Sequence, residues 1–153
     1  MRKIIIYLCF FILSGCAGYN PLFSTKKLSF YIEAIENVSD NKITRKISQN
    51  LNNNNLKIED KKNYILKITS YKKDVITSRD SKGVASTYEM IIDVKVEVFY
   101  NDKITPIATL IINKKSNYNT QINKFNLSQY KNIIEENIIG EIAQEITIKL
   151  HSL

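Results

Sequence analysis

The sequence predicts an α+β domain of two layers, in which a four-stranded mixed sheet carries two helices on one face. The predicted element order is β-α-β-β-β-α. Three observations lead to this fold class. One long segment alternates strictly between apolar and polar residues, two segments repeat apolar residues every third or fourth position, and short polar segments separate them. No internal repeat and no second domain is evident.

The first strand and the first helix are predicted between residues 28 and 51. The strand alternates apolar and polar residues, and the helix repeats an apolar residue at every fourth position. These apolar residues are Leu28, Phe30 and Ile32 in the strand and Ile43, Ile47 and Leu51 in the helix. We expect Ser39 or Asp40 to cap the helix. The helical crossover to the next strand predicts parallel pairing of the two strands.

Three further strands are predicted to form antiparallel hairpins. The second strand covers residues 64–71, with an extension through residues 75–77, and a turn with Gly83 follows it. The third strand contains the long alternation, whose apolar members are Tyr88, Met90, Ile92, Val94, Val96, Val98 and Tyr100. After a turn at residues 101–103, the fourth strand is expected from Ile104 to about Tyr118. The other face of the third strand is mostly polar, although it retains Ile91 and Phe99.

The last element is predicted to be a helix of about 25 residues that Asn126 or Ser128 caps. Its apolar stripe consists of Tyr130, Ile134, Ile138, Ile142, Ile146 and Leu150, widened by Ile133, Ile139 and Ala143. Glu135 and Glu136 are expected on the polar, solvated side of this helix.

The N-terminus has the pattern of an export signal. Two basic residues precede an uncharged apolar run of ten residues, which is too short to span a bilayer as a helix. The run ends in Leu-Ser-Gly-Cys, which resembles the lipobox of bacterial lipoproteins. We therefore expect residues 1–15 to be a signal peptide, Cys16 to carry acyl chains of the palmitate type, residues 16–25 to be a tether, and residues 26–153 to form one domain. The alternative is an ordinary secreted protein with a free thiol.

The composition argues against an enzyme. Removal of Arg2 and Lys3 lowers the formal charge from +7 to +5, and Cys9 leaves with the signal peptide. The single histidine, His151, stands two residues from the end, so no Ser-His-Asp triad is expected. No Cys-His metal spacing and no glycine-rich phosphate loop is present in the sequence, so we predict no cofactor, no metal and no catalytic residue. Nucleic acid is excluded as a partner because an exported protein does not meet it.

Basic residues gather around the second-strand hairpin and in the fourth strand. They are Lys72, Lys73, Arg79, Lys82, Lys114 and Lys115. Such side chains pair well with phosphate groups, which in the cell envelope belong to lipid headgroups and lipid A. The simpler interpretation is a solvated basic edge that prevents strand-to-strand aggregation.

Two short motifs resemble the LptE family of lipopolysaccharide-assembly lipoproteins. The segment Cys-Ala-Gly-Tyr-Asn-Pro-Leu-Phe at residues 16–23 is similar to the Cys-Gly-Phe-x-Pro-Leu-Tyr opening of alphaproteobacterial members, with an inserted Ala17 and exchanged aromatic residues. Residues 79–89, with Arg79, Ala85 and Tyr88, are similar to the family's hairpin before its third strand. The predicted element order also matches the family.

The resemblance implies a lipoprotein that sits as a plug in the β-barrel LptD, in a 1:1 complex, and helps it fold. It also implies that the pair delivers lipopolysaccharide to the outer leaflet and that the plug binds lipopolysaccharide itself. Ala17 in place of Asp implies, by comparison with enterobacterial lipoproteins, anchoring on the periplasmic side of the outer membrane. Two alternatives are an auxiliary lipoprotein of a phospholipid-transport ABC system and an envelope hydrolase with an unrecognised site.

Overall fold

The structure, a computed structural model, describes residues 30–39, 41–53, 62–100 and 103–153. Its elements in chain order are β1 (Phe30–Asn37), α2 (Lys42–Asn53), β2 (Lys62–Arg79), β3 (Ala85–Tyr100), β4 (Ala108–Asn119) and α3 (Lys124–His151). Leu28 and Asp40 lie outside the described residues, as do the predicted signal peptide and tether.

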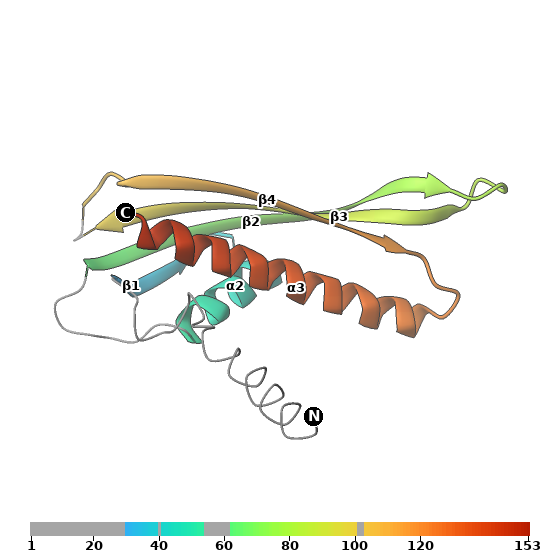
Figure 1. Ribbon diagram of the computed structural model, residues 1–153, viewed down its shortest axis with the longest axis horizontal. Helices are drawn as coiled ribbons and strands as arrows, with labels where there is room; N and C mark the ends of the chain where they lie inside the picture. Colours follow the sequence, from blue (N-terminus) through green and yellow to red (C-terminus); the bar gives the residue numbers. More distant parts are fainter. Residues whose placement is uncertain (1–29, 40, 54–61, 101–102) are drawn as a thin grey trace, which may run out of the picture.

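The four strands form one sheet in the order β1-β2-β3-β4. β1 pairs with β2 in parallel, and the other neighbours are antiparallel, as the crossover and the hairpin turns predict. Both helices cover the same face of this sheet (Figure 1). The predicted fold class, a two-layer arrangement in the order β-α-β-β-β-α, is confirmed.

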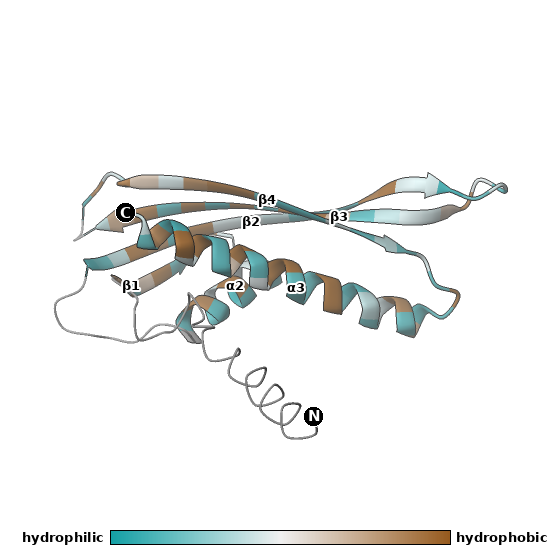
Figure 2. Cartoon of the chain, in the orientation of Figure 1, coloured by the Kyte–Doolittle hydropathy of each residue, from teal (hydrophilic) through white to brown (hydrophobic). Residues whose placement is uncertain are grey.

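The core lies between the sheet and the two helices. The alternating residues of β3 supply its centre, and Met90, Ile92 and Val96 are completely buried there. Ile139, Ile142 and Ile146 of α3 are also completely buried, whereas Ile133, which the sequence placed on the edge of the stripe, is exposed. Figure 2 shows the apolar residues along the side of α3 that meets the strands. The burial of this apolar surface is the main force that closes the two layers.

The first helix starts from a polar cluster instead of the predicted Ser39 cap. Asn41 Oδ1 accepts a hydrogen bond from the Thr44 backbone N–H (2.9 Å), which makes Asn41 the cap. The same side chain donates to the Ser70 carbonyl in β2 (2.9 Å). Ser39 Oγ accepts a hydrogen bond from the Ser70 N–H (2.9 Å). One amide thus joins α2 to the sheet, a role that local spacing does not reveal.

The long helix also begins earlier than its spacing predicts. Asn123 Oδ1 accepts hydrogen bonds from the N–H groups of Phe125 (2.9 Å) and Asn126 (3.3 Å), so Asn123 is the cap. The predicted caps Asn126 and Ser128 lie within α3, which has 28 residues. The sequence offers several Asn and Ser residues in this region, and only the loop geometry selects one of them.

The fourth strand begins later than predicted. Its ladder starts at Ala108, opposite Val98, and Ile104 is 97% exposed in the loop before it. Pro106 lacks an N–H group and cannot donate to a ladder, which delays the strand. The predicted extension of β2 through residues 75–77 is confirmed, because β2 continues to Arg79. Gly83 closes the turn with φ of +78°, as its position predicts.

The molecule is elongated because β2 and β3 continue well beyond β1 and α2 as a hairpin (Figure 1). The first turns of α3 run beneath this extension, and Lys131 Nζ of α3 lies 2.6 Å from Asp74 Oδ2 of β2. Within the described ranges, no helix has the length and apolarity needed to cross a membrane.

Replacing Asn41 with Ala tests the cap that links α2 to the sheet. We expect Asn41→Ala to lower the free energy of unfolding by about 2 kcal/mol, because it removes a helix cap and leaves buried polar groups without a partner. Urea unfolding followed by circular dichroism measures the change. Asn126→Ala is the matched control, because that exposed side chain does not cap α3, and we expect less than about 0.5 kcal/mol from it. Equal losses in both variants would disprove the linking role.

Candidate functional site

The structure divides the six predicted basic residues into three groups. Lys72 and Lys114 lie opposite Ile92 in register and face the helices, whereas Lys73 and Lys115 lie opposite Ile91 and face outward. Arg79 and Lys82 stand at the tip of the β2–β3 hairpin. The two lysine pairs lie on either side of β3, but the hairpin tip lies several residues farther along β2, and alternation distributes the six residues over two faces and one tip.

The inward-facing pair is engaged in ion pairs with α3. Lys72 Nζ lies 2.6 Å from Glu135 Oε2, and Lys114 Nζ lies 2.9 Å from Glu145 Oε2. The hydrogen bond with Glu145 raises the pKa of Lys114, against the smaller opposing effect of desolvation. These two lysines therefore join the sheet to α3, which limits their capacity to bind a ligand.

The outward-facing pair flanks an isoleucine on the uncovered face of the sheet. Ile91 is only 8% exposed, although no described helix covers this face. Lys73 and Lys115 stand directly beside it in the neighbouring strands, where long lysine stems shield apolar surface. Lys115 Nζ approaches Glu89 only to 3.9 Å, and Lys73 forms no ion pair within the described part of the chain.

The hairpin tip is ordered by its own hydrogen bonds. Asp80 Oδ1 accepts hydrogen bonds from the N–H groups of Lys82 (2.9 Å) and Val84 (2.8 Å). Arg79 Nη1 donates to the Gly83 carbonyl (2.9 Å), which fixes the guanidinium beside the turn. Neither Arg79 nor Lys82 forms an ion pair with an acidic residue that the structure describes. The turn therefore presents two cations that are not ion-paired with a described residue, beside the Asp80 carboxylate that accepts the backbone hydrogen bonds.

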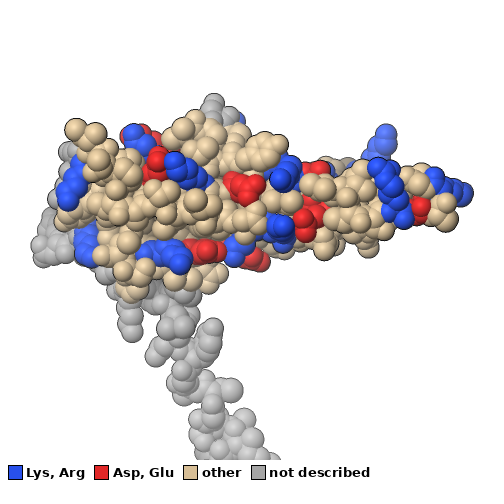
Figure 3. All heavy atoms as spheres, turned by 90° about the horizontal axis from the view of Figure 1, so that it is seen from above, with Lys and Arg blue, Asp and Glu red and all other residues tan. Residues whose placement is uncertain are grey.

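The face of the sheet away from the helices carries a shallow hollow farther along. It has a volume of about 220 Å³, and its lining includes Tyr71, Asp93 and Ile111. Tyr71 and Ile111 are largely exposed. Figure 3 shows this face with most of its charges interspersed, and with Lys and Arg gathered at the narrow end that the hairpin forms. The exposed cations and the uncovered apolar surface therefore lie on the same side of the molecule.

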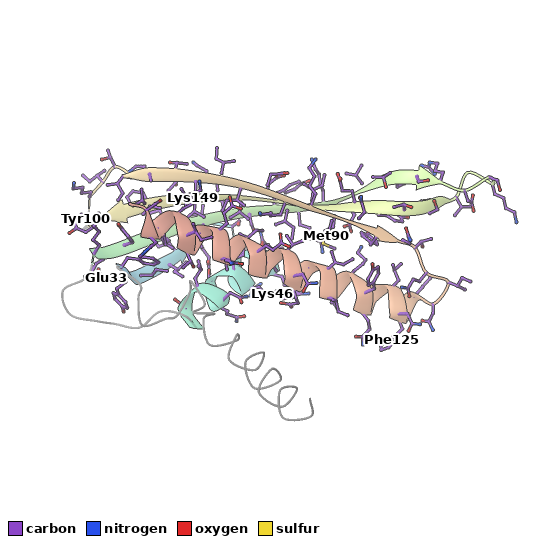
Figure 4. The ribbon with its side chains drawn as sticks, in the orientation of Figure 1. Glu33, Lys46, Met90, Tyr100, Phe125 and Lys149 are labelled. Atoms are coloured by element: carbon purple, nitrogen blue, oxygen red, sulfur yellow. The ribbon has the colours of Figure 1, made fainter. Side chains whose placement is uncertain are left out.

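Glu135 is the residue that the sequence interpretation missed. It is 3% exposed in α3, where it accepts hydrogen bonds from Lys46 of α2 (2.9 Å) and Lys72 of β2 (2.6 Å). Lys42 Nζ lies 3.3 Å away, and Lys46 also pairs with Glu136. Lys46, labelled in Figure 4, extends from α2 toward α3. This cluster joins three elements at one point.

The cluster shifts the pKa values of both its acidic and its basic members. Burial alone raises the pKa of Glu135, but hydrogen bonds from Lys72 and Lys46 outweigh it and lower that pKa to about 2. Burial lowers the pKa of Lys46, but its hydrogen bonds to Glu136 and Glu135 outweigh that effect and raise it. The sequence did contain a signal for the burial of Glu135. This residue precedes Ile139 by one helical turn and Ile142 by two, so all three lie on the buried face of α3.

Within the described ranges, no three His, Cys, Asp or Glu side chains come together as a metal site requires. His151 lies in the last turn of α3 and is exposed. The arrangement is that of an elongated two-layer wedge with a basic tip, in which ion pairs join α3 to the sheet and α2 to α3.

The fold of this two-layer domain is similar to that of several lipoproteins of known structure. Rare lipoprotein B from Shewanella oneidensis superposes with a TM-score of 0.61 at 20% identity, covering 80% of this chain and 94% of its own. A lipoprotein from Caulobacter crescentus gives a TM-score of 0.59 at 13% identity, with 77% and 88% covered. A minor lipoprotein from Acinetobacter baumannii gives 0.58 at 13% identity, with 81% and 92% covered. At these identities the likeness concerns the fold.

The family is established by the sequence profile of LptE, described as lipopolysaccharide-assembly, which matches residues 28–150. The chain therefore belongs to the LptE family. No curated protein matches the chain. The family match confirms the resemblance that the opening motif and the hairpin indicated.

Replacing Glu135 with Gln tests the three-element ion cluster. The folded-state pKa of about 2 lies below the ordinary value of 4.5, so the cluster stabilises the fold above about pH 4.5 and loses this effect as pH falls toward 2. We expect Glu135→Gln to lower the free energy of unfolding at pH 7 by roughly 2–3 kcal/mol and to flatten its decline in acid. Denaturant unfolding between pH 2 and pH 7 measures both effects.

The control for this experiment is Glu136→Gln, the neighbouring and more exposed partner of Lys46. An exposed ion pair contributes about 0–1 kcal/mol, so this variant should remain close to the unmodified protein. If the two variants have the same unfolding profile across the pH range, Glu135 does not hold the elements together.

Proposed function

We propose that this protein is an outer-membrane lipoprotein that plugs the LptD β-barrel in a 1:1 complex, assists its assembly and helps deliver lipopolysaccharide to the outer leaflet. The family match over residues 28–150 carries this proposal. Acylation of Cys16 after removal of residues 1–15 would anchor the protein on the periplasmic side of the membrane. The role is one of assembly and binding, without catalysis.

The shape and surface of the domain support this role. The domain is elongated, and ion pairs join α3 to the sheet and α2 to α3, so it would keep its form inside a barrel. Its uncovered sheet face mixes charged and apolar side chains, which suits the wet interior of a partner as well as water. The alternative, an auxiliary lipoprotein of a phospholipid-transport system, gains no support from the family match, and neither does a hydrolase.

We also propose that the basic hairpin contacts the sugar phosphates of lipopolysaccharide. Arg79 and Lys82 are the primary candidates, because neither forms an ion pair with a described acidic residue, and the turn fixes the Arg79 guanidinium and the Lys82 backbone. Lys73 and Lys115 would extend the contact along the uncovered face. The remaining two predicted residues, Lys72 and Lys114, are held by α3, and we assign them a supporting electrostatic role.

The barrel partnership predicts a specific purification result. Affinity purification of the lipidated protein from its native envelope should yield a large β-barrel at a 1:1 ratio, and depletion of the protein should lower the amount of mature, heat-modifiable barrel. Quantitative mass spectrometry and electrophoresis without boiling measure the two effects. Recovery of an ATPase or a lipid-shuttle component in place of a barrel would contradict the proposal.

The ligand contact predicts that the double variant Arg79→Ala/Lys82→Ala binds lipopolysaccharide at least about tenfold more weakly, because charge-assisted hydrogen bonds to phosphate contribute about 1.5–3 kcal/mol. Titration of labelled lipopolysaccharide measures the affinity. The control is Lys95→Ala/Lys149→Ala, which removes the same charge at exposed positions outside the hairpin tip. Equal affinities in the two double variants would reject a specific role of the tip.

A further inference from the structure

The end of the domain opposite the hairpin tip carries an exposed apolar loop that the proposed function does not use. Ile104 is 97% exposed, and Ile107, three residues later, is also exposed. Ile104 lines a hollow of about 300 Å³ on the outer side of the sheet, together with Ile65 and Phe99. Isoleucines in this position indicate a surface that a partner or a lipid covers.

Two cations border the same hollow. Lys67 Nζ lies 3.0 Å from Glu36 and 5.2 Å from the centre of the Phe99 ring, so it is already engaged. Lys103 also lines the hollow, and it forms no ion pair with an acidic residue of the described part. An apolar side chain next to a lysine is the combination that enters the headgroup region of a membrane, because the aliphatic part is buried while the charge stays at the lipid phosphates.

The course of the chain determines which end faces the membrane. The described chain enters the domain at Phe30. The ring centres of Phe30 and Tyr64 are 5.9 Å apart, and those of Tyr64 and Tyr100 are 6.2 Å apart. The Lys103 N–H donates to the Tyr100 carbonyl (3.3 Å), which brings the exposed loop to this end. Figure 4 labels Tyr100 at this end and Phe125 at the other. The chain therefore enters the domain beside the loop.

The length of chain before Phe30 keeps this end near the membrane. If Cys16 is acylated, the segment up to Phe30 spans at most about 50 Å when fully extended. The 18-residue strand β2 leads from this end to the hairpin tip over about 60 Å. The tether therefore gives the loop with Ile104 a high effective concentration at the lipid surface, whereas the basic tip lies at the far end of the sheet.

We infer that the loop containing Lys103 and Ile104 docks on the surface of the anionic phospholipid membrane that holds the lipid anchor. Ile104 enters the boundary between headgroups and acyl chains, and Lys103 contacts a headgroup phosphate. Docking orients the domain with its basic tip away from this membrane leaflet. The inference rests on the lipid anchor of the proposed function and not on the barrel partnership.

Tryptophan fluorescence tests this inference, because the sequence contains no tryptophan and one introduced residue reports alone. The full-length lipidated variants Ile104→Trp and Ile122→Trp are reconstituted in phosphatidylcholine vesicles with phosphatidylglycerol, with or without brominated acyl chains. Ile122 is equally exposed but lies in the loop before α3, at the other end. We expect brominated lipids to quench the fluorescence of the Ile104→Trp variant at least threefold more strongly than that of the Ile122→Trp variant.

A second variant tests the headgroup contact. Adding Lys103→Glu to Ile104→Trp should reduce the quenching at least twofold in vesicles with phosphatidylglycerol, and omission of phosphatidylglycerol should have the same effect. Equal quenching at positions 104 and 122 would overturn the docking orientation. If neither Lys103→Glu nor the omission of phosphatidylglycerol changes the quenching, the contact between Lys103 and anionic headgroups is disproved. Failure of the lipid anchor is recognised separately, because none of the variants would then float with the vesicles.

Discussion

The fold depends on one constraint, which is that the inner face of β3 is apolar from Tyr88 to Tyr100 and must be covered. A single-layer sheet leaves that face in water, and only a long helix reaches from one end of it to the other. α3 meets this need with 28 residues that run beneath the sheet, and Met90 near one end and Val98 near the other are both completely buried. The length of the apolar face of β3 therefore accounts for both the length of α3 and the elongation of the molecule.

Polar contacts then decide how the helices sit on this apolar surface. Hydrophobic burial lacks direction and would allow α2 to slide or rotate. Asn41 fixes the start of α2 by bonding both to the helix and to Ser70, and Glu135 connects α2 and β2 to α3. At the distal end, Asp74 and Lys131 join β2 to α3 in the same manner. Apart from the local Asn41 cap, each of these contacts joins residues far apart in sequence, so each specifies tertiary position and not local structure.

This distinction explains what the sequence predicted and what it did not. Element types, their order and the long extension of β2 follow from periodicity, which a short segment carries on its own. The caps Asn41 and Asn123 were misassigned because several neighbouring residues have equal capping capacity. A tertiary contact with Ser70 selects Asn41, whereas the loop geometry selects Asn123. Ile104 was misassigned to the fourth strand because alternation persists through Pro106, where the ladder cannot begin. Glu135 was predicted to be solvated because the prediction followed its charge and not its position on the buried stripe of the helix.

The candidate site was harder to predict than the fold, for a related reason. Six basic residues are close in the sequence pattern, but the two-residue period of a strand sends adjacent lysines to opposite faces. Lys72 and Lys114 face carboxylates of α3 and act within the fold, while Lys73 and Lys115 face outward, where no described helix lies and Lys115 meets Glu89 only at 3.9 Å. A protein that must hold its shape in a partner and also offer charge to a ligand needs cations of both kinds. The alternation of two strands supplies both from two adjacent pairs, and the lipopolysaccharide contact that we propose would use the outward-facing pair.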